Sequence, residues 1–263
     1  MKANVLDLTK IKVSCRDCNL AELCLPHGLH QDELARLDRI VKRAMPLHKG
    51  DHLFRAGDAL SSIFAVRSGA IKLYALDNSG AEQILGFYLP GELVGLDAIN
   101  GERHKGFAMA LETSSLCAIP FQRLEDIGHQ LPALGHQLLK LVSREISHEN
   151  RLLLSLANRS AEERIASFLI NMSGRYRCLG YSAQEFRLPM PRKDIGLFLG
   201  LTMETVSRIF NRLQREEIVH ADRRFVRIIN PEKLDRLCAG PMTITLAQGR
   251  CVKDPARGAP RNC

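Results

Sequence analysis

The stretch RKDIGLFLGLTMETVSRIFNRLQREEIV, residues 192–219, contains two short helical periods joined by a glycine and a threonine. The first period has one apolar face, made by Ile195, Phe198 and Leu199. Gly200 suits the sharp turn that follows, and Thr202 is a preferred N-cap for a second helix. The second period also has an inward face, made by Val206, Ile209, Phe210 and Leu213. The stretch therefore predicts a helix-turn-helix.

The second of these helices leaves a polar face for another molecule. Glu204, Ser207 and Arg208 are spaced i, i+3 and i+4, so they share one face near its N-terminal half. That part of a recognition helix reaches base edges in the major groove, where arginine can bind guanine and glutamate can accept from cytosine. Further arginines are available for phosphate contacts: Arg212, Arg215, Arg223 and Arg224.

Two interpretations of this polar face are open. It could be the solvated side of an ordinary helical hairpin, because a helix-turn-helix pattern is only moderately specific. The capped turn, the polar triplet and the basic surroundings together favour DNA binding, with Thr202 and Arg212 beside the triplet. HADRRFVRIIN, residues 220–230, reads as a β-hairpin, as in winged variants of the motif.

The charge of the 263-residue chain agrees with a polyanionic partner. Its formal net charge is +8 at pH 7, which favours nucleic acid first and an anionic membrane surface second. Charged residues interrupt the first twelve positions, so no apolar signal core forms, and no stretch approaches the length of a membrane span. These patterns predict a cytoplasmic protein that has no membrane partner.

Upstream of the helical unit, residues 29–131 carry regularly spaced glycines. The spacing lies near the 8–12 residues that are typical of short antiparallel strands joined by turns. The glycines that set this rhythm are Gly57, Gly69, Gly80, Gly91 and Gly101. The zone is therefore predicted to form a small β-barrel or β-roll.

Residues 132–160 switch to a helical period that suits the pairing of two helices. The predicted seam consists of Val142, Ile146, Glu149, Leu153 and Leu156. Glu149 would meet its own copy in a parallel pair, and like charges repel. Either the seam is slightly rotated with Glu149 at its edge, or Glu149 opposes dimerisation so that a modest signal can switch it. The second interpretation is slightly favoured.

The whole chain is predicted to be an α+β protein. Its expected parts are an N-terminal cysteine segment (1–28), a double-stranded, jelly-roll-like β-roll sensor domain (29–131), a long dimerisation helix (132–160), a winged helix-turn-helix (161–238) and a loosely ordered tail (239–263). No role is assigned to the remaining cysteines: Cys178, Cys238, Cys251 and Cys263.

The N-terminal segment VSCRDCNLAELCLPHG, residues 13–28, gathers Cys15, Cys18 and Cys24. In a reducing compartment, clustered thiols indicate metal or redox chemistry rather than disulfides. Taken alone, Cys117 is more typical of a small buried core residue. Its assignment therefore depends on a wider comparison.

METVSRIFNRL in a C-terminal helix-turn-helix, the glycine-spaced β-roll and the connecting helix together resemble the family of cyclic-AMP receptor protein and FNR. The resemblance covers about residues 13–237 and is strongest to the FNR branch, the oxygen-responsive fumarate and nitrate reduction regulators. The pattern Cys15-x2-Cys18-x5-Cys24 matches the N-terminal cluster motif of that branch. Cys117 falls where the family supplies its fourth ligand. Glu204, Ser207 and Arg208 match the family's Glu-x-x-Ser-Arg reading motif.

The resemblance implies a function as well as a fold. It implies that Cys15, Cys18, Cys24 and Cys117 hold a [4Fe-4S] cluster, which oxygen converts to [2Fe-2S] and onward to apo-protein. The cluster-loaded homodimer would bind double-stranded DNA at TTGAT…ATCAA palindromes, and would activate or repress genes of anaerobic metabolism. It would contact RNA polymerase through β-roll loops, of which the loop around Asn78 and Gly80 is the candidate.

Two departures from the wider family are expected to matter. Cyclic-nucleotide-binding relatives hold the sugar with glutamate and the phosphate with arginine and serine, whereas Asp97, Gly106 and Phe107 stand near those places here. Without that arginine the phosphate lacks its charge-assisted partner, so no cyclic nucleotide is expected. The second departure is Pro191, which replaces the serine or threonine expected to cap the first helix of the reading unit.

Other classes of protein agree less well with the sequence. The sequence contains no P-loop, dinucleotide-binding glycine motif, His-Glu-x-x-His or nucleophile elbow, so it is not predicted to be an enzyme. Four thiolates also suit zinc. A zinc-stapled or haem-sensing transcription factor of the same fold stays open, and an iron–sulfur electron-transfer protein is less favoured. The ligand layout, three cysteines on one loop and one distant, suits a sensor better than a structural staple.

Overall fold

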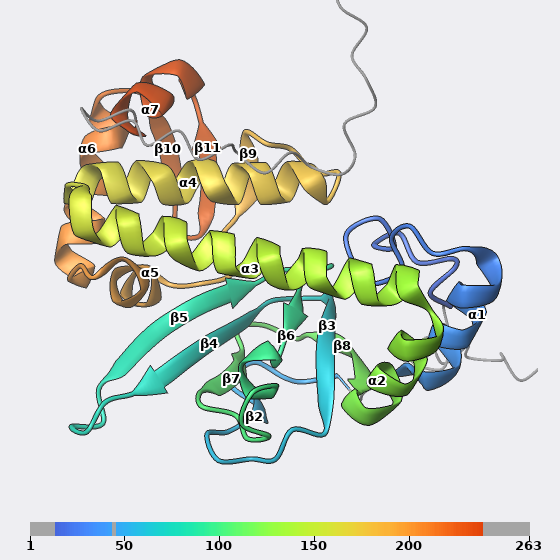
Figure 1. The fold of residues 1–263 in the computed structure, drawn as a ribbon. Helices are drawn as coiled ribbons and strands as arrows, with labels where there is room; N and C mark the ends of the chain where they lie inside the picture. The colour runs from blue at the N-terminus through green and yellow to red at the C-terminus, as the bar shows by residue number, and fades with distance from the viewer. Residues whose placement is uncertain (1–13, 44–45, 239–263) are drawn as a thin grey trace, which may run out of the picture.

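The computed structural model describes residues 14–43 and 46–238 (Figure 1). The predicted tail and the cysteines Cys251 and Cys263 lie outside the described residues. The fold class is the predicted one, an α+β chain with a β-sheet sensor domain, connecting helices and a C-terminal helix-turn-helix.

The sensor domain is a roll of two four-stranded antiparallel sheets. The sheet orders are β1-β8-β3-β6 and β2-β7-β4-β5. The strands are β1 (Lys42–Arg43), β2 (His52–Phe54), β3 (Ser62–Ser68), β4 (Ile71–Leu76), β5 (Glu82–Tyr88), β6 (Leu93–Val94), β7 (Phe107–Ala110) and β8 (Ser115–Pro120). A 3-10 turn, η2 (Leu96–Ala98), follows β6.

Gly69 shows why glycine sets the rhythm of the roll. It turns the chain from β3 into β4 with a φ of 81°, which side chains rarely adopt. A Cβ at this position would lie 2.6 Å from the carbonyl oxygen of Thr113, so only glycine fits. The turn therefore lets both sheets close over one core, in which Val66, Ile71 and Leu116 are almost fully buried.

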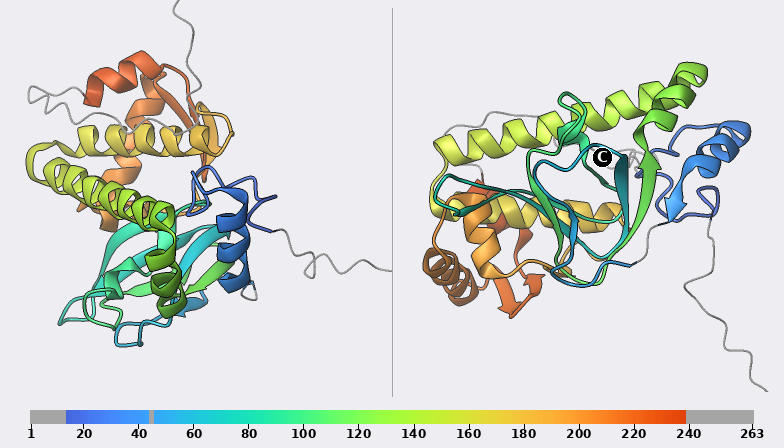
Figure 2. Two further views of the ribbon diagram at one scale, coloured as in Figure 1. Left: turned by 45° about the vertical axis from the view of Figure 1, so that its right-hand side comes forward. Right: turned by 90° about the horizontal axis from the view of Figure 1, so that it is seen from below.

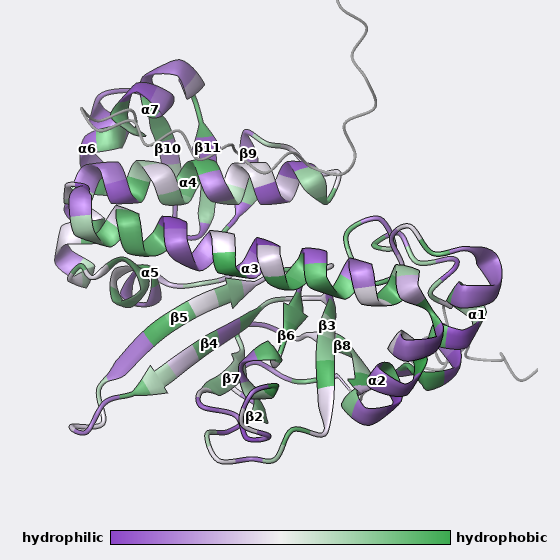
Figure 3. Ribbon diagram, viewed as in Figure 1, coloured by the Kyte–Doolittle hydropathy of each residue, from purple (hydrophilic) through white to green (hydrophobic). Residues whose placement is uncertain are grey.

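Four helices surround the roll: α1 (Gln31–Ile40), α2 (Phe121–Gln130), α3 (Pro132–Asn158) and α4 (Ala161–Cys178). The 27-residue α3 crosses the roll, and α4 returns beside it toward the C-terminal unit (Figures 1 and 2). Helices α1 and α2 lie within the zone predicted as a β-roll, and neither was foreseen. The visible side of α1 is mostly hydrophilic, whereas the strands beneath α3 carry hydrophobic segments (Figure 3).

The C-terminal unit contains the helix-turn-helix and a small sheet. Its helices are α5 (Arg192–Leu199), α6 (Met203–Arg215) and α7 (Pro231–Cys238). Its antiparallel sheet has the order β10-β11-β9, with β9 (Glu185–Arg187), β10 (Val219–Asp222) and β11 (Phe225–Ile228). β10 and β11 form the hairpin that the sequence predicts after the second helix.

A single apolar core joins the roll to the C-terminal helix-turn-helix unit. The ring of Phe87 on β5 lies 6.4 Å from that of Phe168 on α4 and 5.1 Å from that of Phe198 on α5, centroid to centroid. Polar contacts rim this core, because the Gln83 side chain donates to the carbonyl of Leu197 at 2.8 Å. The sensor sheet therefore packs directly against the helix-turn-helix.

Candidate DNA-reading surface and cysteine site

Local sequence explains the position of the second helix of the reading unit. Helix α5 ends at Gly200, whose φ of 64° is left-handed, as the turn requires. The Thr202 hydroxyl then accepts a hydrogen bond from the backbone N–H of Thr205 at 3.1 Å. Val206, Phe210 and Leu213 are buried, which fixes the rotation of α6 about its axis.

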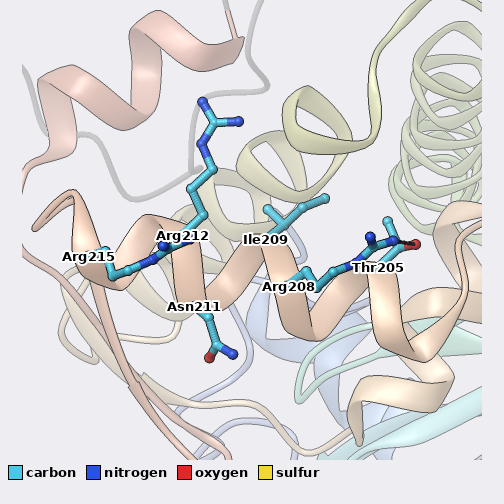
Figure 4. Close-up of a pocket in the computed structure, with 6 residues that line it drawn as sticks. All are labelled: Thr205, Arg208, Ile209, Asn211, Arg212 and Arg215. Carbon is cyan, nitrogen blue, oxygen red and sulfur yellow. Dashed lines mark hydrogen bonds between the residues drawn. The ribbon is translucent and has the colours of Figure 1, made fainter.

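With this rotation, the predicted polar triplet of α6 faces solvent. Glu204 and Arg208 are exposed, and Ser207 is half-buried. Arg208 Nη2 lies 3.2 Å from the hydroxyl of Thr205, so the guanidinium is directed along the exposed face of α6 (Figure 4). The face can therefore present a carboxylate, a hydroxyl and a guanidinium together.

A shallow groove follows this face and includes residues that sequence reasoning missed. Its lining residues, drawn in Figure 4, are Thr205, Arg208, Ile209, Asn211, Arg212 and Arg215. Asn211 was not among the predicted contacts, although it stands three positions after Arg208 and so lies on the same helical face. Ile209, predicted to face inward, is half-buried and contributes an apolar wall.

The surrounding arginines are not equivalent. Arg212 lies 3.0 Å from Glu162 and 2.8 Å from Glu216, so two carboxylates engage it. Arg224 donates to the carbonyl of Pro189 at 2.7 Å and supports the hairpin. Arg215 and Arg223 are exposed, so their charges face solvent.

Pro191 makes no side-chain cap at the start of α5. Arg192, the first residue of that helix, has its guanidinium carbon 3.1 Å from the ring centroid of Phe210 on α6. Burial lowers the pKa of Arg192 to about 10, so the side chain remains charged at neutral pH. A cation–π contact therefore links the two helices where no cap is present.

The N-terminal cysteines lie on a loop built from tight turns. Backbone N–H groups of Ala21 and Cys24 bond to the carbonyls of Cys18 and Leu20, at 3.1 Å in each case. Two side chains from distant helices reach the loop. Asp38 of α1 accepts from the N–H of Cys15 at 2.8 Å, and Gln137 of α3 donates to the carbonyl of Cys24 at 3.3 Å.

The middle of this loop rests on the turn between β5 and β6. Gly91 has a φ of 89°, and a Cβ added there would lie 2.8 Å from Cβ of Leu23. The next residue, Glu92, pairs with Arg175 of α4, with 2.5 Å between Oε2 and Nη2. Two consecutive residues of the roll, Gly91 and Glu92, therefore contact the cysteine loop and α4 respectively.

Cys117 lies on β8 and approaches this loop from the roll. It stands opposite Ala65 on β3 and opposite Arg43 on β1. Cys24 and Cys117 pack against the same apolar core, which includes Leu25 and Ile119. The strand and the loop therefore bring the fourth cysteine toward the first three.

Cys15, Cys24 and Cys117 share an unfavourable environment for isolated charge. Burial, the carboxylate of Asp38 and charge on Cys117 and Cys24 raise the pKa of Cys15 to about 12. Burial also raises the pKa of Cys24 to about 12, and charge on Cys117 and Cys18 adds to the effect. The pKa of Cys117 is raised by burial, which Arg43 and Arg67 oppose. Charged thiolates here would need a compensating cation.

The donor set fits a thiolate-bound metal group in chemistry and in place. The predicted ligands all carry free thiols and are all half-buried: Cys15, Cys18, Cys24 and Cys117. Within residues 14–43 and 46–238, no three His, Cys, Asp or Glu side chains are gathered closely enough to hold an ion in this conformation. The structure therefore brings the four thiols into one region, but their sulfur atoms are not close enough together to coordinate one ion.

Helix α3 presents a stripe of exposed apolar side chains. Leu139 is 69% exposed, Ile146 53% and Leu153 63%, and they recur every seven residues. Glu149 is exposed beside this stripe, whereas Val142 and Leu156 are half-buried. Leu139 was missing from the predicted seam, although a heptad counted back from Ile146 includes it.

The interior near Asp97 is already occupied by protein groups. Asp97 lies 3.2 Å from Nδ1 of His104 and accepts from the N–H of Lys105 at 3.0 Å. The buried His104 ring stacks on Phe54 with 3.6 Å between centroids. No arginine takes part in these contacts of Asp97 and His104.

In the part of the chain that the structure describes, no helix combines the length and the apolar character that crossing a bilayer requires.

Comparison with known families matches two segments of the chain. Residues 163–237 match the Crp-like helix-turn-helix domain. Residues 44–130 match the cyclic nucleotide-binding domain. The first segment contains the reading unit described above, and the second contains the strands β2 to β8 of the β-roll.

Curated proteins and solved structures give more specific similarities. The chain is 50% identical to the transcriptional activator protein Anr of Pseudomonas protegens, over 86% of this chain and 93% of that protein. It is 46% identical to the fumarate and nitrate reduction regulatory protein of Vibrio cholerae, over 86% and 90%. The structure of FixK2 from Bradyrhizobium japonicum aligns with a TM-score of 0.71 at 29% identity, covering 77% of this chain and all of FixK2.

Proposed function

The chain belongs to the FNR branch of the Crp/FNR family of transcription regulators, and from this premise we propose that it is an oxygen-responsive regulator controlled by an iron–sulfur cluster. The protein is not an enzyme. Its proposed signal is molecular oxygen, and its proposed output is transcription of genes for life with little or no oxygen. Such a regulator acts on DNA in the cytoplasm.

The convergence of Cys117 and the N-terminal loop on one core carries this proposal. Residues that are far apart in the sequence, Cys24 and Cys117, pack against the same apolar cluster, with Arg43 opposite Cys117. Burial disfavours charge on these thiols, and a bound metal group would compensate it. A structural staple would not need one ligand from the roll and three from a separate loop.

The proposed ligands are Cys15, Cys18, Cys24 and Cys117, and a [4Fe-4S] cluster bound there would supply an oxygen-sensitive link between loop and roll. The chain's own residues position the loop and limit solvent access. Leu20 and Leu25 are buried on either side of Cys24, so the thiols lie within an apolar shell.

The exposed stripe of α3 supports a homodimer as the DNA-binding form. In a parallel pair of helices, residues that recur every seven positions face the equivalent residues of the other helix. Leu139, Ile146 and Leu153 would therefore be covered by the same residues of a second copy. Glu149 would then face its own copy and weaken the pair. A modest change at the cysteine loop can therefore decide whether the two copies associate.

The exposed face of α6 supports recognition of a palindrome of the TTGAT…ATCAA type. In the dimer, two α6 helices would enter successive major grooves one helical turn apart. Arg208 would bind guanine, Glu204 would accept from cytosine, and Ser207 would contact a neighbouring base. Arg215 and Arg223 would supply phosphate contacts.

Two further parts of the proposal concern other partners. The Asp97–His104 contacts and the stacked Phe54 fill the interior near the expected ligand site, which supports a roll that binds no cyclic nucleotide. RNA polymerase is proposed to meet the turn between β4 and β5, where the Asp77 carboxylate accepts from the N–H groups of Ser79 and Ala81 and makes a compact exposed turn.

Anaerobic absorption spectra, with iron and sulfide assays, test the proposed function. Protein isolated without oxygen should be straw-brown, contain about four irons and four sulfides per chain, and bleach in air. Cys24→Ser should abolish cluster retention, whereas Cys238→Ser should leave it unchanged. A colourless protein that contains stoichiometric zinc would contradict the oxygen-sensor assignment and would indicate a zinc-stapled regulator. Sharp haem bands in the absorption spectrum would indicate a haem-based sensor instead.

A further inference from the structure

We propose that Asp38 and Gln137 are positioning residues that hold the Cys15–Cys24 segment in place, one at each end. The inference rests on the cluster site proposed above, but it concerns two side chains outside the cysteine set. Each belongs to a different helix, and each forms a hydrogen bond with the backbone of a ligand residue.

Asp38 fixes the first end of the segment. Its Oδ1 accepts a hydrogen bond from the backbone N–H of Cys15 at 2.8 Å, across 23 positions of sequence. The same oxygen lies 3.5 Å from Nη2 of Arg43, so the carboxylate is itself oriented. Arg43 stands opposite Cys117 in the pairing of β1 with β8. A short series of contacts therefore ties Cys15 to the strand that carries Cys117.

Gln137 fixes the second end. Its side chain is only 5% exposed on α3, and its Nε2 donates to the carbonyl of Cys24 at 3.3 Å. A buried amide that loses its acceptor is costly, so this contact resists displacement of the loop. Because α3 also carries the exposed apolar stripe, the backbone of Cys24 is attached to the helix proposed to form the dimer.

Between the two ends, the segment keeps its shape through its own turns. The carbonyls of Cys18 and Leu20 accept from Ala21, Leu23 and Cys24 N–H groups within the loop. Such local bonds set the shape of the loop but not its place on the protein. Asp38 and Gln137 therefore supply long-range hydrogen bonds that position its two ends.

Pre-positioning has a measurable consequence for a thiolate site. A loop that is already ordered loses less conformational entropy when its ligands close around a metal group. Removal of either contact should let the loop open more often, even without a cofactor. The cofactor should then enter more slowly and leave more quickly.

Hydrogen–deuterium exchange of the full-length apo-protein tests this inference directly. The peptide that contains residues 14–24 should exchange roughly tenfold faster in Asp38→Ala and in Gln137→Met, because each loses one hydrogen bond with a buried or charged partner. Asp38→Asn keeps an acceptor oxygen and should stay near wild type. The matched control is Glu22→Gln, which alters a pair with His27 (3.2 Å) in the same loop and leaves both ends attached.

The same variants should also change the loaded protein. Cluster lifetime in air, followed by absorption, should shorten several-fold in Asp38→Ala and Gln137→Met but not in Asp38→Asn. Unchanged protection of α6 amides in each variant confirms that the fold is retained. Should one of the two variants Asp38→Ala and Gln137→Met lose that protection, the other still tests the attachment at its own end of the loop.

The possible outcomes separate this inference from the proposed function. Wild-type exchange of residues 14–24 in both Asp38→Ala and Gln137→Met would overturn the inference, whatever the cofactor. Equal loss of protection in Asp38→Asn and Asp38→Ala would also overturn it, because charge and not hydrogen bonding would then matter. A wild-type protein without iron and sulfide would overturn the proposed function, while faster exchange in the variants would still support the two attachments.

Discussion

Nζ of Lys72 on β4 lies 3.6 Å from Oδ2 of Asp194 on α5, and both side chains are buried where the sensor sheet meets the helix-turn-helix. Glu82 lies 3.1 Å from the same ammonium group. Burial raises the pKa of Asp194, an effect that Lys72 opposes. Two carboxylates therefore share one lysine at the boundary between the sensor sheet and the helix-turn-helix.

Lys72→Met should lower the free energy of unfolding by about 3 kcal/mol, because it leaves the buried Asp194 carboxylate and the half-buried Glu82 carboxylate without their cation. Adding Asp194→Asn and Glu82→Gln to the same chain should recover most of the loss. Urea denaturation of the single and triple variants measures both effects. Strictly additive losses would show that the three groups do not act as a unit.

Glu149→Ala should strengthen association of the apo-protein by about 1 kcal/mol, roughly fivefold in dissociation constant, because it removes like charges from the proposed seam. Asn150→Ala, on the neighbouring exposed position, is the control. Sedimentation velocity over a concentration series measures the change. An unchanged dissociation constant would contradict a dimer that is opposed by its own glutamates.

Arg208→Ala should cost about 1–3 kcal/mol on the palindromic site and little on random DNA, because a base contact is lost. Arg215→Ala should weaken binding to both DNAs by similar amounts and reduce the salt dependence, as expected for a phosphate contact. Titrations by fluorescence anisotropy at two salt concentrations separate these cases. Equal losses on both DNAs in Arg208→Ala would make Arg208 a phosphate contact.

Gly91→Ala should displace the cysteine loop, because the new Cβ would lie 2.8 Å from that of Leu23. Gly57→Ala is a close control, since its φ of 90° imposes the same backbone strain and its Cβ would meet nothing within 4 Å. Both variants should lose about 1 kcal/mol of stability from strain. Only Gly91→Ala should also shorten cluster lifetime in air, and equal lifetimes would show that the loop does not depend on this contact.

Stability should fall as the pH is lowered through the range in which His148 titrates. Burial, together with the charge of Arg175, lowers its pKa from 6.5 to about 4, so the folded protein keeps the imidazole neutral while the unfolded chain binds a proton. The contribution of neutral His148 to the free energy of unfolding is complete above pH 6.5. It decreases by up to about 3 kcal/mol as the pH falls toward 4. His148→Asn should remove this part of the pH dependence in urea denaturation curves. An identical profile would place His148 in contact with solvent.

The sequence predicts the elements whose signals are local. The turn at Gly200, the cap at Thr202 and the buried face around Phe210 follow from short spacings, so the reading unit was predicted in its correct order. The β-roll follows from glycine spacing. Helix α1 was missed because it lies in a zone that glycine-rich turns dominate, and its ten residues were assigned with their neighbours.

Long-range contacts account for the rest. Asp38 and Gln137 reach the cysteine loop across 23 and 113 positions, and no local pattern marks either residue. Lys72 reads as an ordinary exposed strand lysine until α5 is placed beside it. The cysteine ligands, the reading triplet and the role of Glu149 remain predictions that the experiments above address.

The aromatic contact of Phe87 with Phe168 and Phe198 limits how this architecture can be recombined. In a chimera that joined this roll to the DNA-binding unit of a distant relative, Phe87 on β5 would face side chains of a different size. The interface would then contain either a cavity or a steric clash beneath β5. A substitution at one of these three positions therefore requires compensating substitutions at the other two. An engineer who wishes to redirect the specificity of the protein should alter the outer face of α6 and leave the layer beneath it untouched.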